Sequence, residues 1–143
     1  MDVLQIAMWL AMHQQPAFPA RIEWAIEYTE SRGNPKVKNG PTMGLWQVDW
    51  HYASRPVRND PSLLYLPAVA RNEGRRMLWY WHGKCRGDMS CALAAYNCGY
   101  GGISGKCGRG YAKTVLRRAG EAHWSVEYLA DHCRACPDCC VEE

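Results

Sequence analysis

Apolar residues recur at the spacing of α-helices along most of this chain, and prolines and glycines interrupt them. Such a period turns one stripe of each helix toward a core. The first stripe consists of Val3, Ile6, Ala7 and Leu10. It predicts an N-terminal core helix that ends near residues 14–16, which read Gln-Gln-Pro. The pattern predicts a mainly α fold, and 143 residues are enough for one domain with a buried core.

The next predicted helix runs from Ala20 to Arg32, because Ile22, Ala25 and Ile26 share one of its faces. Gly33-Asn34-Pro35 then ends it, as glycine and proline end helices generally. Residues 33–45 are rich in Gly, Pro, Asn and Lys, which predicts an irregular connection with room for a short hairpin.

A long helix is predicted from Asp60-Pro61, where aspartate would cap and proline would begin the helix, to about Trp81. Ser90 is the expected N-cap of the helix that follows. The remaining predicted segments are a loop with six glycines at residues 99–110 and two short helices at residues 111–118 and 121–130.

Two compositional features bear on function. The formal net charge of +3 comes without a long run of Lys or Arg, so we expect no nucleic-acid partner. Seven Trp and eight Tyr stand against one Phe. Trp and Tyr combine a flat apolar face with a polar group, which suits packing against sugar rings in a wet cleft.

Residues 1–12 resemble a signal peptide only superficially. Gln5 interrupts the apolar run, Asp2 stands where a basic residue would be expected, and no small-residue cleavage site follows. The run is also too short to span a bilayer. We therefore expect no signal peptide in the given chain and no membrane insertion.

The chain has eight cysteines, and an even number at this density favours disulfides and an oxidising environment. By proximity, we expect Cys85 to pair with Cys91 and Cys98 with Cys107. The other four form a cysteine-rich tail: Cys133, Cys136, Cys139 and Cys140. Their spacing also suits a tetrathiolate zinc site. Disulfides are favoured there, because two adjacent cysteines fit a tetrahedral cage poorly.

Three short motifs are polar where a buried segment should be apolar: Glu30-Ser31, the Gln47 end of Gly44-Leu45-Trp46-Gln47, and Tyr96-Asn97. Cleaving a glycosidic bond near neutral pH needs a carboxylic acid with a raised pKa. Glu30 lies at the edge of an apolar stripe and at a helix C-terminus, and both positions disfavour its charge. By periodicity alone, Glu30 would instead face solvent in line with Glu23 and Glu27. The accompanying motifs favour a catalytic acid.

Four motifs in order resemble the catalytic domain of the soluble lytic transglycosylases, which are relatives of goose-type lysozyme. They are Glu30-Ser31 with Asn34-Pro35, Gly44-Leu45-Trp46-Gln47, Ala92 to Gly99, and Tyr111. The resemblance extends over about residues 20–118. It implies a lysozyme-like helical domain with an active-site cleft, to which the sequence adds the short cysteine-rich tail.

The resemblance also implies the chemistry. Glu30 would protonate the oxygen between N-acetylmuramic acid and N-acetylglucosamine, and would then act as base on the C6 hydroxyl to close a 1,6-anhydro ring. The N-acetyl group of the sugar would stabilise the oxocarbenium-like centre, so the reaction needs no second carboxylate, cofactor or metal. The implied substrate-binding residues are Ser31, Gln47, Tyr96, Asn97 and Tyr111.

Within that set, Ser31 would orient the acid or the acetamido group, while Gln47 and Asn97 would hydrogen-bond sugar substituents. Tyr96 would line the cleft or belong to the core, and Tyr111 would approach Glu30 or the muramoyl sugar. We interpret Trp46 as a core residue.

Other functions remain open at this point. A lysozyme-type hydrolase on the same scaffold would need a carboxylate to position water, with Asp49 or Asp60 as candidates. A peptidoglycan-binding virion module without turnover, or a zinc-stabilised interaction protein, would also fit parts of the sequence. A Cys/His protease is disfavoured, because no cysteine lies in a recognisable nucleophile setting.

We therefore expect residues 1–132 to form a transglycosylase domain and residues 133–143 to form the tail. Bacterial peptidoglycan is the expected partner, and the protein is expected to be a monomer. Action on the cell wall, in the periplasm or outside the cell, follows from this substrate. A phage lysin is slightly favoured over a secretion-system enzyme.

Overall fold

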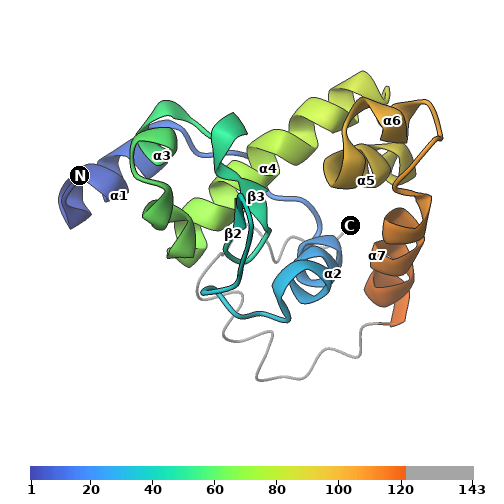
Figure 1. Cartoon of the computed structure of the whole chain (residues 1–143), viewed down its shortest axis with the longest axis horizontal. Coiled ribbons are helices and arrows are strands. Elements are labelled where there is room, and N and C mark those ends of the chain that lie inside the picture. Colours follow the sequence, from blue (N-terminus) through green and yellow to red (C-terminus); the bar gives the residue numbers. More distant parts are fainter. Residues whose placement is uncertain (122–143) are drawn as a thin grey trace.

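The computed structural model describes residues 1–121, which fold into a mainly helical domain with one small sheet (Figure 1). The helices are α1 (Val3–Met12), α2 (Ala20–Ser31), α3 (Arg55–Asn59), α4 (Pro67–Lys84), α5 (Met89–Cys98), α6 (Tyr100–Ile103) and α7 (Arg109–Glu121), with the 3-10 helices η1 (Trp50–Tyr52) and η2 (Pro61–Tyr65). The strands β1 (Lys38–Asn39), β2 (Thr42–Met43) and β3 (Val48–Asp49) form an antiparallel sheet in that order. The mainly α fold and the short hairpin are both confirmed.

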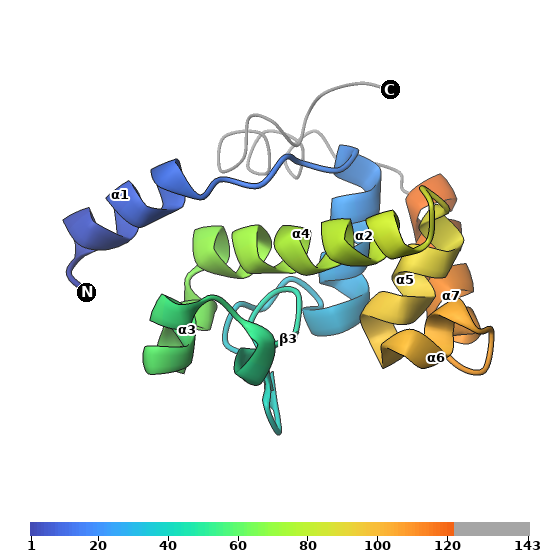
Figure 2. The same ribbon diagram turned by 90° about the horizontal axis from the view of Figure 1, so that it is seen from above.

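Helix α4 runs through the middle of the domain, and the other elements lie around it. Figure 2 shows α5, α6 and α7 near its C-terminal end and α3 near its N-terminal end, while α2 crosses it. The predicted face of α2 is buried, with Ala25 and Ile26 inaccessible to solvent and Ile22 nearly so. This core also holds large side chains from four other segments: Trp46, Leu64, Leu78 and Leu93.

Helix α1 forms as predicted, but the prediction that it is a core helix is wrong. None of its residues is buried, and Val3 is 85% exposed. Only Ile6, Trp9 and Leu10 pack partly against the core, because α1 projects from the domain and meets mainly α4 (Figures 1 and 2). None of the helices in residues 1–121 is long and apolar enough to cross a membrane.

The single long helix predicted over residues 60–81 is wrong at its start. The structure has the 3-10 helix η2 over Pro61–Tyr65, and α4 begins only at Pro67. Proline lacks an N–H group and clashes with a preceding turn of helix, so it is tolerated in the first turn of α4 but not inside a continuous helix. Asp60 makes no side-chain hydrogen bond that caps η2.

Two predictions around α5 also need correction. Its N-cap is Asp88, whose carboxylate accepts a hydrogen bond from the Cys91 N–H, and not Ser90. The glycine-rich segment is not all loop, since it contains α6 and the first turn of α7. The predicted helix at residues 121–130, the domain boundary at residue 132 and the cysteine-rich tail fall wholly or mainly outside the described residues.

Both expected disulfides in the described part of the chain are confirmed, Cys85–Cys91 before α5 and Cys98–Cys107 after it. The first joins the C-cap of α4 to the first turn of α5, and the second joins the last residue of α5 to the segment before α7. Helix α5 is therefore held covalently at both ends.

Three glutamates are buried together with arginines of α4. Arg75 makes two hydrogen bonds to Glu23, at 2.8 and 2.7 Å, and Arg71 Nε lies 2.6 Å from Glu27 Oε1. Arg76 pairs in the same way with Glu73. The Glu23–Arg75 and Glu27–Arg71 pairs bind α2 to α4, whereas the Glu73–Arg76 pair lies within α4. They also show that Glu23 and Glu27 do not face solvent, so a solvent-facing row of glutamates on α2 is excluded.

We expect Arg75→Met to lower the free energy of unfolding by about 3–5 kcal/mol, because it leaves the buried Glu23 carboxylate without its cation. Chemical denaturation at pH 7 measures the change. The double variant Glu23→Leu/Arg75→Met removes both charges and should recover most of the loss. If Arg75→Met were as stable as the wild type, the Glu23–Arg75 pair would not contribute to stability as expected.

Candidate active site

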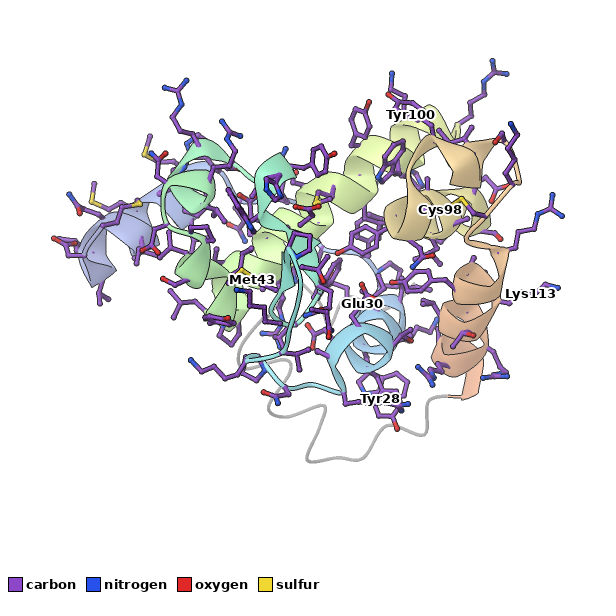
Figure 3. The ribbon with its side chains drawn as sticks, viewed as in Figure 1. Tyr28, Glu30, Met43, Cys98, Tyr100 and Lys113 are labelled. Carbon is purple, nitrogen blue, oxygen red and sulfur yellow. A yellow bond between two sulfur atoms is a disulfide. The ribbon has the colours of Figure 1, made fainter. Side chains whose placement is uncertain are left out.

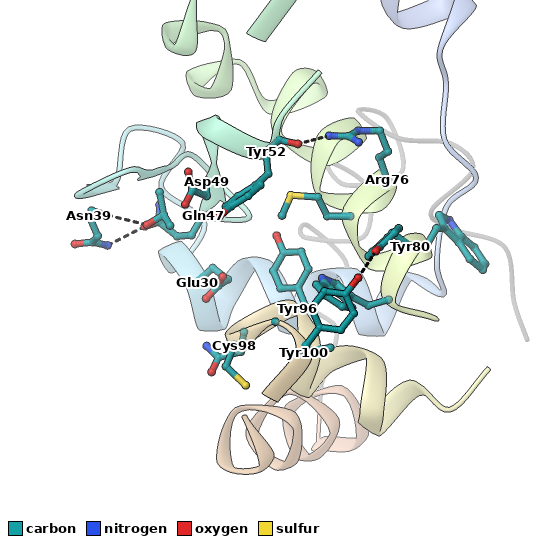
Figure 4. Close-up of a pocket in the computed structure, with 17 residues that line it drawn as sticks. Glu30, Asn39, Gln47, Asp49, Tyr52, Arg76, Tyr80, Tyr96, Cys98 and Tyr100 are labelled. Carbon is teal, nitrogen blue, oxygen red and sulfur yellow. Dashed lines mark hydrogen bonds between the residues drawn. The ribbon is translucent and has the colours of Figure 1, made fainter. Parts of the chain in front are cut away.

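A cleft of about 1180 Å³ brings together residues from most of the chain (Figure 4). It is lined by Glu30 from α2, Asp49 of the small sheet, Gln47 from the turn before β3, one side of α4, and the C-terminal end of α5 with Tyr96 and Asn97. Four of the six predicted site residues therefore share one cleft. The other two, Ser31 and Tyr111, lie behind its surface.

Glu30 is the distinctive ionisable group of this cleft. Its side chain is half-buried, and no group among residues 1–121 donates a hydrogen bond to it or forms an ion pair with it. Desolvation by burial raises the pKa of Glu30 to about 8. The carboxyl group therefore carries its proton at neutral pH, which is the state that a general acid requires. Figure 3 shows Glu30 directed toward the centre of the domain.

Trp46 links the helices around Glu30. Its side chain is fully buried, as predicted, and its Nε1–H donates to Glu27 Oε1 at 3.1 Å. Its backbone carbonyl accepts a hydrogen bond of 2.6 Å from the Tyr96 hydroxyl. Its ring lies against Gly74 of α4, where a Cβ atom would come within 2.4 Å of Trp46 Cε3. Trp46 thus fixes α2, α4 and α5 relative to one another.

Tyr96 has both of the roles considered for it. The residue lines the cleft, while its hydroxyl is satisfied by the Trp46 carbonyl. Burial raises the pKa of the Tyr96 hydroxyl well above its usual value, and the nearby Glu30 charge adds to the rise. The phenol therefore stays neutral beside the acid.

The Gln47 amide is already fully engaged within the protein. Its Nε2 donates to the carbonyls of Val37 and Gly44, and its Oε1 lies 2.9 Å from both Asn39 Nδ2 and Thr42 Oγ1. These bonds hold Gln47 at a φ of 47°, which is uncommon for a residue with a side chain. Gln47 therefore shapes the loop at the cleft wall, and direct contact with a sugar stays a prediction.

Ser31 and Tyr111 occupy the region behind Glu30. The Ser31 hydroxyl is buried within 2.9 Å of the carbonyls of Glu27 and Leu45, so it ties α2 to the Trp46 segment. The Tyr111 hydroxyl is buried and has no hydrogen-bond partner among the described residues. Burial raises the pKa of Tyr111 well above its usual value, with a further contribution from Glu30. This places Tyr111 close to the acid. Of the two partners expected for its hydroxyl, the Glu30 carboxyl and the muramoyl sugar, the burial of the hydroxyl behind the cleft wall favours Glu30.

Of the carboxylates considered as partners for Glu30, only Asp49 lines the cleft. Its Oδ1 accepts hydrogen bonds from the His51 N–H at 3.0 Å and lies 2.8 Å from His51 Nδ1. Asp60 is exposed outside the cleft, next to Ser62, and Glu73 is buried against Arg76. Within residues 1–121, Asp49 is therefore the candidate for a second carboxylate in the cleft.

Sequence reasoning missed several residues of the cleft wall, namely Asn39, Thr42, Tyr52, Arg76, Tyr80 and Tyr100. The excess of tyrosine and tryptophan was the only sequence signal for the aromatic ones. None of them lies in a motif, and only the fold brings the hairpin, α4 and α6 to the same wall.

This mainly helical domain, with Glu30 in the wall of its cleft, is of the lysozyme-like kind. The chain matches the family model described as the Transglycosylase SLT domain over residues 7–115, and it belongs to this family. Family membership implies lytic transglycosylase activity on peptidoglycan and action on the cell wall. Comparison with curated proteins and with solved structures gave no significant match.

Glu30→Gln should make the protein more stable than the wild type above neutral pH. Because the folded-state pKa of Glu30 is about 8, against 4.5 for an unperturbed glutamate, the folded wild type loses stability as pH rises through this range. The loss approaches about 1.4 kcal/mol per pH unit between these values. Thermal unfolding of both proteins at pH 5 and pH 8.5 measures it. If the stability of Glu30→Gln relative to the wild type were the same at pH 5 and at pH 8.5, the raised pKa of Glu30 would be contradicted.

Tyr111→Phe should leave the free energy of unfolding unchanged or raise it by about 1 kcal/mol, since it removes a buried hydroxyl without a partner. The same variant should lose activity if the hydroxyl acts on the nearby Glu30 carboxyl. Denaturant unfolding and turnover of purified peptidoglycan measure the two effects. A clear loss of stability would show that the hydroxyl has a structural partner.

Proposed function

We propose that this domain is a lytic transglycosylase that cleaves the β-1,4 bond between N-acetylmuramic acid and N-acetylglucosamine and forms 1,6-anhydro ends. Glu30 is the acid and base of both steps. The observation that carries the proposal is the half-buried Glu30 carboxyl, which faces the cleft with a pKa of about 8 and no ion-pair partner among residues 1–121.

In the first step, the protonated Glu30 donates its proton to the glycosidic oxygen as the bond to the muramoyl C1 breaks. The leaving N-acetylglucosamine departs as an alcohol, and the sugar's N-acetyl group stabilises the positive charge at C1. In the second step, the Glu30 carboxylate accepts the proton of the C6 hydroxyl, whose oxygen bonds to C1. Glu30 ends protonated, as it began.

The cleft supports roles for the other predicted residues. Asn97 is exposed on α5 and lines the cleft, so its amide is available for sugar substituents. Tyr96 forms part of the wall beside Glu30. Tyr111 would approach the Glu30 carboxyl from behind the cleft wall, while Ser31 and Gln47 hold the backbone that surrounds the acid.

A lysozyme-type hydrolase is the second candidate, and the observation that favours it is Asp49 in the same cleft. In that case Asp49 would position or activate a water that attacks C1, and the product would be a reducing sugar. Its hydrogen bonds to His51 give Asp49 a structural role as the cap of η1. Transglycosylation without Asp49 is therefore preferred.

Mass spectrometry of the soluble products from purified peptidoglycan tests the reaction. The wild type should release 1,6-anhydromuropeptides, which borohydride does not reduce. Glu30→Gln should release none at matched protein concentration, because its amide cannot supply the proton. Removal of a general acid typically lowers the rate by about 10²–10⁴-fold.

Asp49→Asn and Asp60→Asn are the matched controls for this experiment. Both remove one carboxylate, the first inside the cleft and the second outside it. Both should still give anhydro products. Reducing products that vanish in Asp49→Asn would instead identify a hydrolase, and full activity of Glu30→Gln would refute the assigned acid.

The proposal also covers the oligomeric state, the partners and the origin of the protein, as expected from its sequence. The protein acts as a monomer on the bacterial wall, with neither a nucleic-acid partner nor a cofactor in the reaction. A phage origin, as an endolysin, is favoured slightly over a secretion-system role. Sedimentation of the purified protein tests the monomer directly.

A further inference from the structure

A cluster of three aromatic rings, two of them exposed, lies at the end of the cleft away from Glu30. Tyr80 and Trp81 come from the last part of α4, and Tyr100 is the first residue of α6. All three line the same cleft as Glu30, and Tyr96 lies between Glu30 and the two tyrosines in Figure 4. Figure 3 also shows Tyr100 and Glu30 well apart.

The rings of the cluster hold one another in place. The Tyr80 and Tyr100 hydroxyls are 2.7 Å apart and share a hydrogen bond. Trp81 meets both tyrosines edge to face, with ring centroids 4.9 Å from Tyr80 and 5.0 Å from Tyr100. Such edge-to-face contacts are a favoured arrangement of aromatic pairs. The cluster is therefore preorganised, although Tyr80 is 49% and Tyr100 64% exposed.

Tyr100 is the member with a ring available for a ligand. The Lys84 ammonium lies 5.5 Å from the centroid of the Tyr80 ring and covers one side of it, whereas Trp81 is half-buried. The described residues place no cation over the more exposed Tyr100 ring. An exposed aromatic ring that is held in one orientation beside a cleft is covered more favourably by the apolar face of a ligand ring than by water.

The backbone under Tyr100 is fixed as well. Helix α6 lies directly on α5, since a Cβ atom on Gly102 would come within 2.4 Å of the Ala94 and Ala95 backbone. The Cys98–Cys107 disulfide spans α6 and closes the segment that contains it. Tyr100 therefore cannot fold back into the domain without disrupting this packing.

We propose that Tyr100 is a stacking platform for a sugar ring of the glycan strand, at a subsite remote from the cleavage point. This rests on the proposed function, because the strand that reaches Glu30 is the occupant. The Tyr100 ring is part of the cleft lining, and the hydrogen bond between the Tyr80 and Tyr100 hydroxyls fixes its orientation. Tyr80 acts as a positioning residue through that bridge, and Trp81 supports both rings.

The proposal predicts a binding defect that is separate from the chemistry. In a Glu30→Gln background, which prevents turnover, Tyr100→Ala should weaken binding of peptide-free glycan strands and of chitohexaose by about tenfold, while Tyr100→Phe stays within about threefold. Isothermal titration calorimetry measures both affinities. Ile103→Ala is the matched control, since it truncates another exposed side chain of α6 outside the cleft.

With Glu30 present, Tyr100→Ala should raise KM on glycan strands and leave kcat nearly unchanged. Tyr80→Phe keeps its ring but loses the bridge, and it should raise KM less than Tyr100→Ala does, with an unchanged Tm. Equal binding by Tyr100→Ala and its parent would overturn the platform. A lower kcat with unchanged affinity, or a defect seen only on strands that carry stem peptides, would also overturn it.

A measurement on the unmutated ring keeps the test valid if Tyr100→Ala does not fold. With ¹³C-labelled tyrosine in the Glu30→Gln protein, chitohexaose should shift the Tyr100 ring signals, while those of Tyr28, which lies outside the cleft, stay in place. Unshifted Tyr100 signals at saturation would refute the proposal. Chitohexaose lacks the bond to N-acetylmuramic acid that the proposed reaction cleaves, so its binding does not depend on that reaction. Failure of Glu30→Gln to abolish activity would therefore count against the proposed reaction alone.

Discussion

The arrangement of the cleft depends on how Trp46 is held. A side-chain hydrogen bond to Glu27, a backbone hydrogen bond from Tyr96 and the close approach to Gly74 meet at this one residue. They join α2, α4 and α5, which supply the acid, the floor and the far wall of the cleft. A buried indole with a satisfied N–H can serve in this way, because it fills space and still carries one directional contact.

The glutamates of α2 show how one helix holds both structural and chemical carboxylates. Glu23 and Glu27 are buried, and each pairs with an arginine of α4. Glu30 is the next glutamate along the helix, and within residues 1–121 it has no such cation. Its desolvation is therefore uncompensated, and the pKa rises. All three residues are glutamates, so the difference between the ion-paired carboxylates and Glu30 comes from where each lies relative to the arginines of α4.

The sequence predicted the parts of this structure that depend on local chemistry. Periodicity predicted the helical stripe of α2, and proximity in the chain predicted the two disulfides. The shared cleft of Glu30, Gln47, Tyr96 and Asn97 was implied by the family resemblance. The family resemblance is confirmed over residues 7–115. The site assignments themselves remain predictions.

The errors arose where long-range packing decided the outcome. Helix α6 forms in a glycine-rich segment because Gly102 allows it to pack on α5, which no local pattern reveals. The arginines that bury Glu23 and Glu27 lie more than forty residues away in the chain, at sequence separations of 52 and 44. Helix α1 has a core-like stripe, yet the domain provides little surface to cover it.

The two disulfides have a consequence for how the folded protein is held together. They clamp α5 at both ends, closing loops with sequence separations of 6 and 9. In the chain-entropy view, each contributes about 2–3 kcal/mol. In a reducing cytosol, the helix that carries Tyr96 and Asn97 would depend on packing alone. Formation of these two disulfides therefore braces the helix whose C-terminal end forms part of the cleft wall.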